Sequence, residues 1–223
     1  QLTTELGVRY EQVEAAVKLI DEGNTIPFIA RYRKEATGAL NDEVLRNLDE
    51  RLTYLRGLEE KKEQVLRSIE EQGKLTDELK AQIEAAATMV VLEDLYRPYK
   101  SKKRTKATIA REKGLEGLAK TILAQDVKES VKKIAKKYIN SEVKTSEEAI
   151  EGAKDIIAEV ISDNSEFRKK IRQNTFYTGQ IQTKAKDKDS TTEYELYYNY
   201  TEDLRKIPPH RILAINRAEK EGI

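Results

Sequence analysis

Residues Thr25–Leu40 read T-I-P-F-I-A-R-Y-R-K-E-A-T-G-A-L, and the rest of the chain is organised around this stretch. Pro27 suits the first turn of a helix, where its missing backbone N–H is not needed. Ile26 and Ile29 recur at helical spacing and predict a buried face. Gly38 is a residue type that commonly ends a helix. The stretch therefore predicts a short, anchored helix.

The same stretch carries three basic residues, which we call the basic cluster: Arg31, Arg33 and Lys34. One interpretation is that the cluster contacts nucleic-acid phosphates. The alternative is that the two arginines pair with acids on neighbouring helices, since such pairs are common in a chain rich in both charges. After the cluster, Asn41 predicts the N-cap of a long helix, with acids in its first turn.

Apolar periodicity predicts helices along most of the chain. We expect them at 8–22, 42–72, 77–95, 106–112, 115–124, from 126, at 146–162, from 164 or 165, and from 208–209. In the long helix the apolar stripe is interrupted by Glu59 and Lys62, which argues against a coiled coil. The stripe of 146–162 runs to Val160 and Ile161, and the next helix is expected to bury Phe167 and Ile171.

Residues 178–200 alternate between apolar and polar side chains and predict a short β-hairpin around a turn at 186–190. The tyrosines in the second half also suit a helix face, so that half has two interpretations. The predicted fold is all-α in the main: an N-terminal helix-turn-helix-like unit, a long αα-hairpin arm, a second helical group, and a short β-hairpin near 180–200. The predicted domains are 1–75, the N-terminal unit with the first arm helix, and 76–223, the second arm helix and a helical scaffold.

The composition bounds the function. The chain has 223 residues, of which 38% are hydrophobic and 36% charged, and its net charge is +1. Because there is no global basic signal, any nucleic-acid surface must be local. The absence of Cys excludes disulfides and thiolate metal sites. No apolar run approaches a membrane span and no signal peptide is evident, so we expect a cytoplasmic location and no membrane partner.

No motif nominates catalysis. The single histidine, His210, cannot form a Cys–His pair or a common zinc site. There is no P-loop, no G-x-G-x-x-G and no G-x-S-x-G. We therefore predict no catalytic residue, no metal, no cofactor and no enzyme. An enzyme would require a cluster of carboxylates around one cleft.

A second basic stretch, residues 97–106, is the basic loop. It holds six basic residues and no acid: Arg97, Lys100, Lys102, Lys103, Arg104 and Lys106. Clustered cations bind phosphates and release counterions, and the neighbouring Tyr96 and Tyr99 suit stacking on bases. Thr105 or Thr108 suits the cap of a helix whose N-terminus faces an anion. The alternative is a solvated or salt-bridged loop.

Several ordered motifs resemble the Tex family of bacterial transcription accessory proteins. They are G-N-T-I-P-F-I-A-R-Y-R-K-E-A-T-G-A-L at 23–40, L-E-D-L-Y-R-P-Y-K at 92–100, K-R-T-K-A at 103–107, residues 149–161, and I-P-P-H-R-I-L-A-I-N-R at 207–217. The chain departs from the family at Ala218, where Gly is usual, which concerns local backbone geometry. The resemblance implies a longer protein that continues into RNase H-like, helix-hairpin-helix and OB-fold RNA-binding domains. Because the chain starts without Met, we also expect it to be a piece of something longer.

These observations predict a non-catalytic nucleic-acid-binding and scaffold module of a transcription accessory protein. The basic loop is the first predicted contact and the basic cluster the second. The expected partners are RNA or DNA, the transcription machinery, and the C-terminal domains of the full-length chain. The alternative is a structural or protein-interaction module with no nucleic-acid contact of its own.

Overall fold

The computed structural model describes residues 1–101, 103–126, 128–187 and 189–223. They form two compact units, Gln1–Tyr96 and Arg97–Ile223. Both are mainly helical, and one two-stranded antiparallel sheet lies in the second unit, so the predicted fold class is confirmed. In the described residues, no helix has the length and apolar character needed to span a membrane.

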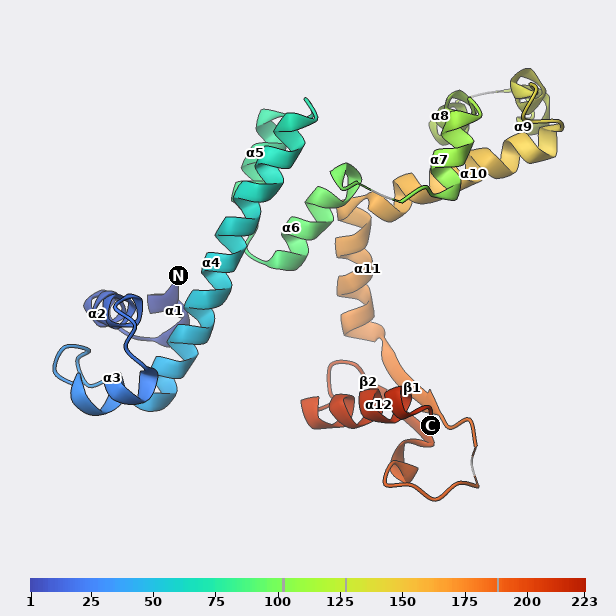
Figure 1. The fold of residues 1–223 in the computed structure, drawn as a ribbon. Coiled ribbons are helices and arrows are strands. Elements are labelled where there is room, and N and C mark those ends of the chain that lie inside the picture. The colour runs from blue at the N-terminus through green and yellow to red at the C-terminus, as the bar shows by residue number, and fades with distance from the viewer. Residues whose placement is uncertain (102, 127, 188) are drawn as a thin grey trace. The chain divides into compact units, whose positions relative to one another are not determined.

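The first unit is arranged along one long helix, α4 (Figure 1). Its helices are α1 (Leu2–Leu6), α2 (Tyr10–Asp21), α3 (Ile26–Tyr32), α4 (Asp42–Glu71), α5 (Asp77–Glu84) and α6 (Met89–Tyr96). As predicted, Asn41 caps α4, accepting a hydrogen bond from the Val44 N–H at 2.8 Å. Helices α2, α3 and α4 share one core made of Val13, Ala16, Ile29, Leu40, Leu45 and Leu48.

The single helix predicted at 77–95 is wrong, because the chain breaks between α5 and α6. Lys62 of α4 shows why. Its ammonium donates to the Glu84 carbonyl at the end of α5 and to the Glu59 carboxylate, each at 2.8 Å. The charge that interrupts the apolar stripe of α4 thus satisfies the last turn of α5. The predicted division after residue 75 falls between α4 and α5, inside the first unit, and as a domain boundary it stays a prediction.

The second unit is built on α10, with α7, α8 and α9 beside it (Figure 1). Its elements are η1 (Arg97–Tyr99), α7 (Lys106–Glu112), α8 (Glu116–Ala124), α9 (Val131–Ala135), η2 (Lys136–Tyr138), α10 (Ser146–Asp163), α11 (Ser165–Thr178), β1 (Gln180–Lys184), η3 (Glu195–Tyr197), β2 (Asn199–Asp203) and α12 (Pro209–Glu221), where η marks short 3-10 helices. The core is rich in alanine, so its helices pack closely. A Cβ on Gly152 of α10 would lie 2.4 Å from Leu115 Cδ1, so a larger residue there would require the Leu115 side chain to move.

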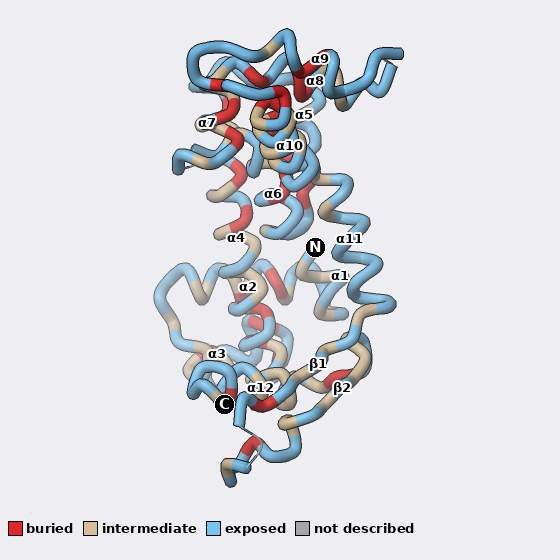
Figure 2. The backbone as a smooth tube through the Cα atoms, turned by 90° about the vertical axis from the view of Figure 1, so that its right-hand side faces the viewer, coloured by how far each residue is buried: buried red, intermediate tan, exposed pale blue. Residues whose placement is uncertain are grey.

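Three local predictions in this unit need correction. The helix expected from residue 126 starts at Val131, because Ser130 supplies the cap by accepting from the Lys133 N–H. Phe167 and Ile171, expected inside, are 45% and 65% exposed. None of the residues of α11 is buried, as Figure 2 shows. Val160 and Ile161, at the end of α10, are also exposed. Periodicity predicts that an apolar face exists but not that another element covers it.

The predicted β-hairpin is confirmed. Strand β1 pairs with β2 antiparallel, with Gln180 opposite Asp203 and Lys184 opposite Asn199. Both interpretations of its second half are wrong for residues 194–198, which contain the 3-10 helix η3, and the strand begins only at Asn199. The connection between the two strands is therefore longer than the turn predicted at 186–190. Residue 188 of the predicted turn lies outside the described residues.

The first unit contains an acid-sensitive ion pair. Arg51 of α4 donates to the Glu5 carboxylate of α1, with Nη2 to Oε1 at 2.8 Å. This bond, together with a second from the Gln1 side chain, lowers the pKa of Glu5 from 4.5 to about 2. A depressed folded-state pKa adds stability above the unfolded value, and this contribution is lost as the pH falls. We expect the first unit to lose stability between about pH 4.5 and pH 2. In thermal unfolding across this range, Glu5→Gln should lose less stability than the native chain, and an identical decline would contradict the pairing.

Candidate nucleic-acid interface

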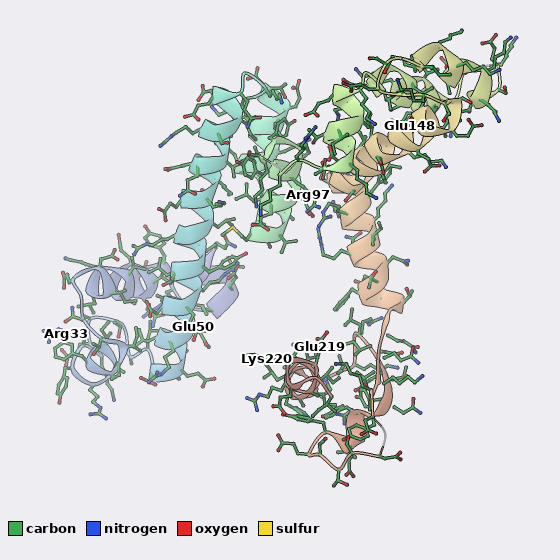
Figure 3. All side chains as sticks on the ribbon, turned by 45° about the vertical axis from the view of Figure 1, so that its right-hand side comes forward. Arg33, Glu50, Arg97, Glu148, Glu219 and Lys220 are labelled. Carbon is green, nitrogen blue, oxygen red and sulfur yellow. The ribbon has the colours of Figure 1, made fainter. Side chains whose placement is uncertain are left out.

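The predicted contact residues fall into two groups, one in each unit. The basic cluster lies at the end of α3, with Arg31, Arg33 and Lys34 all exposed. Figure 3 shows Arg33 on the side of α3 that faces away from α4.

Aromatic rings flank the basic cluster. The Arg33 guanidinium lies 5.2 Å from the Phe28 ring centroid, and Phe28 lies 5.3 Å from Tyr32. The outermost ring, Tyr32, is 66% exposed. Arg33 thus lies over the ring of Phe28, and Phe28 meets Tyr32 at a tilt of 44°. The exposed Tyr32 ring offers a surface on which a base can stack.

The turn that follows α3 is held in place by the protein. The Thr37 side chain is buried and donates to the Arg33 carbonyl at 3.2 Å. Gln12 of α2 donates to the Gly38 carbonyl at 2.8 Å. Gly38 has φ of +59°, and a Cβ there would lie 2.9 Å from Gln12 Nε2. Sequence reasoning missed both residues. Gln12 reaches the turn from α2, which the sequence does not show, whereas Thr37 bonds locally to the Arg33 and Lys34 carbonyls, a common pattern of threonine that could have been found.

Within the described residues, no carboxylate lies within ion-pair distance of Arg31, Arg33 or Lys34. The alternative in which the two arginines pair with neighbouring acids therefore finds no support in the described part of the chain. Glu35 is also exposed, so the segment 31–35 carries three positive charges and one negative charge. The basic cluster is a local positive surface in a nearly neutral protein.

The basic loop is different, because two of its arginines have carboxylate partners. Arg97 Nε lies 3.0 Å from Asp163 Oδ1, and Arg104 Nη2 lies 2.7 Å from Glu112 Oε2. Lys100, Lys103 and Lys106 are exposed and have no carboxylate partner among the residues that the structure places. The remaining predicted contact, Lys102, lies outside the described residues.

The helix end predicted to face an anion already faces one of the protein's own. Thr105 caps α7 by accepting from the Thr108 N–H at 3.1 Å, and its hydroxyl donates to the Glu159 carboxylate at 3.0 Å. Arg111 donates to the same carboxylate at 2.7 Å. A phosphate placed there would meet Glu159, so the start of α7 is a structural junction between α7 and α10.

Arg97 has a role in stability that can be tested separately from binding. Asp163 is the last residue of α10, and its side chain is only 12% exposed. A negative charge at a helix C-terminus is unfavourable, so Arg97→Ala should cost about 1–2 kcal/mol of unfolding free energy. Urea unfolding measures this cost, with Lys100→Ala as the control that leaves stability unchanged. Unchanged stability of Arg97→Ala together with weaker nucleic-acid binding would return Arg97 to the interface.

The described residues include no group of three His, Cys, Asp or Glu side chains placed to hold a metal ion. His210 is exposed at the start of α12. The expectation that the chain is not an enzyme stays a prediction.

Comparison with known proteins gives two family matches. Residues 1–70 match the Tex-like protein N-terminal domain, and residues 126–223 match the Tex central region-like family. The two matched ranges include the basic cluster and α10, but not the basic loop.

The curated relatives agree with these matches. The chain is 46% identical to Transcriptional accessory protein Tex of Neisseria gonorrhoeae over 224 residues, which cover 100% of the chain and 30% of the relative. It is 43% identical to Protein YhgF of Escherichia coli, covering 98% of the chain and 29% of the relative. It is 32% identical to S1 RNA-binding domain-containing protein 1 of Homo sapiens, covering 91% of the chain and 21% of the relative. The chain thus spans about a third or less of these relatives.

Proposed function

Because this chain belongs to the Tex family, with its N-terminal and central-region domains, we propose that it is a non-catalytic module that contacts nucleic acid through the basic cluster. The observation that carries the proposal is the exposure of Arg31, Arg33 and Lys34 without a carboxylate partner among the described residues. Free cations bind phosphates without first breaking an ion pair.

The geometry of the turn supports the same proposal. Gln12 and Thr37 hold the backbone that carries Arg33 and Lys34, so less conformational freedom is lost when these side chains bind. Tyr32 adds a surface on which an unpaired base can stack. The unpaired lysines of the basic loop, Lys100, Lys103 and Lys106, are the second contact in this proposal.

The experiment is binding of single-stranded RNA and of single- and double-stranded DNA by the chain over a series of salt concentrations. We expect affinity that falls linearly with salt on logarithmic axes, because each phosphate contact releases counterions. An absence of binding at low salt would overturn the proposal.

A second candidate function is a protein-interaction module, favoured by α11. This helix has no buried residue, and it exposes Phe167, Ile171, Phe176 and Tyr177. Phe167 and Ile171, four residues apart, share one face of the helix, and an exposed apolar face marks an interaction site. This function predicts that the chain does not bind nucleic acid at moderate salt but binds the remaining domains of its full-length protein. It also predicts that Ile171→Glu abolishes the binding of those domains.

A further inference from the structure

The carboxyl-terminal part of the second unit contains a cavity of about 360 Å³. Strand β1, helix α12 and the segment around η3 form its walls, which are mainly apolar: Ile181, Ala185, Tyr194, Ile215, Ala218 and Ile223. This volume lies in the range of pockets that take a ligand or a large side chain. Figure 3 labels Glu219, which lines the cavity from α12.

The cavity opens beside an unpaired strand edge. In an antiparallel pair, successive residues direct their backbone groups alternately toward and away from the partner strand. The Ala185 N–H donates to the Tyr198 carbonyl, and the Leu204 N–H donates to the Gly179 carbonyl. The odd-numbered residues of this segment therefore pair with β2. By the same alternation, the backbone groups of Gln182 and Lys184 face away from β2.

The chain that leaves α12 is directed to this edge. Gly222 adopts φ of +87°, and the Ile223 N–H donates to the Ala218 carbonyl, which ends the helix and turns the chain. The Ile223 carbonyl then accepts from the Lys186 N–H at 3.5 Å, and the Lys186 ammonium donates to the Gly222 carbonyl at 3.0 Å. Figure 1 shows the carboxyl terminus beside β1.

Two physical arguments indicate that another strand belongs there. A two-stranded sheet is marginally stable alone, and an open edge with free N–H and C=O groups pairs readily. The rim of the cavity carries both signs of charge, from Lys184, Lys186 and Glu219, so it does not select a charged ligand. The apolar walls favour an uncharged side chain.

We propose that the residues following Ile223 in the full-length chain form a third strand, antiparallel to β1, and insert one apolar side chain into the cavity. The Lys186–Ile223 hydrogen bond is the first bond of this ladder. Continuing it places the second residue after Ile223 opposite Lys184 and the fourth opposite Gln182. The relatives are about three times as long as this chain, so a segment for this role exists in proteins of this family. The strand would join the central region rigidly to the part that follows.

Amide hydrogen exchange tests the proposal without nucleic acid. In the full-length protein, the amides of Gln182 and Lys184 should exchange at least about 100-fold more slowly than in the 223-residue chain. Lys184→Pro removes one outward N–H but no bond to β2, and proline is tolerated at such an edge. This variant should lose the protection of Gln182 in the full-length protein and leave the 223-residue chain unchanged. Lys184→Ala is the matched control and should retain the protection.

Two results would overturn the proposal. Rapid exchange of both amides in the full-length protein would show that the edge stays open. Protection that already appears in the 223-residue chain and grows with its concentration would assign the edge to a second copy.

Discussion

Replacing Arg31, Arg33 and Lys34 together by Ala should reduce the slope of log affinity against log salt by about 2 to 3, because each phosphate contact contributes about 0.7–0.9 to this slope. Affinity at low salt should fall at least about tenfold. These residues are exposed and have no carboxylate partner among the described residues. Because Arg33 also contacts the Phe28 ring and donates to the Tyr32 carbonyl, thermal unfolding of the variant checks that the fold is kept. Electrophoretic or anisotropy titrations at several salt concentrations give both quantities.

The matched control is the loop variant Lys100→Ala, Lys103→Ala, Lys106→Ala, which removes the same amount of charge from the second unit. We expect it to reduce the slope less, because the carboxylates of Asp163 and Glu112, paired with Arg97 and Arg104 of the same loop, lower the net positive charge of the loop. The opposite ranking would restore the basic loop as the main contact, as the sequence alone predicted.

The variant Gln12→Ala tests whether the position of the basic cluster matters for binding apart from its charge. Gln12 carries no charge, but its amide holds the Gly38 carbonyl. Its loss should weaken binding without changing the salt slope, since the number of phosphate contacts stays the same. A changed slope would mean that the turn had lost its structure.

Local signals in the sequence predicted local structure well. Asn41 and Thr105 cap helices as the sequence suggested, and Thr145 caps the helix predicted to begin at residue 146. Such caps can be predicted because a cap depends on neighbours three residues away. Pro209 starts the last helix for a similar reason. These interactions are encoded within one turn of chain.

What the sequence could not predict depends on contacts between distant segments. Nothing near Arg97 in the sequence shows that its guanidinium pairs with the carboxylate of Asp163, 66 positions later. The exposure of Phe167 and Ile171 was equally hidden, because their spacing is the same whether or not a partner covers them. We propose the basic cluster ahead of the basic loop for this reason, since charge density counts residues but not their partners.

Lys62→Ala should cost about 2–3 kcal/mol of unfolding free energy in the first unit, a large effect for a single lysine. The Lys62 side chain is only 9% exposed and spans α4 to the end of α5. Its removal leaves the Glu84 carbonyl without this donor, and a hydrogen bond to a charged group contributes about 1.5–3 kcal/mol. The lost packing of the lysine stem adds to this cost. Thermal or urea unfolding of the first unit measures the combined cost of the lost hydrogen bond and the lost packing.

Two further variants divide this effect. Glu59→Gln removes only the ion pair, and because the Glu59 side chain is 66% exposed, it should change stability by no more than about 0.5 kcal/mol. Lys62→Met keeps an apolar stem of similar length but has no donor for the Glu84 carbonyl, so it should fall between the native chain and Lys62→Ala. If Lys62→Met were as stable as the native chain, packing alone would explain the burial of Lys62. The break between α5 and α6 would then need a cause other than the bond from Lys62 to the end of α5.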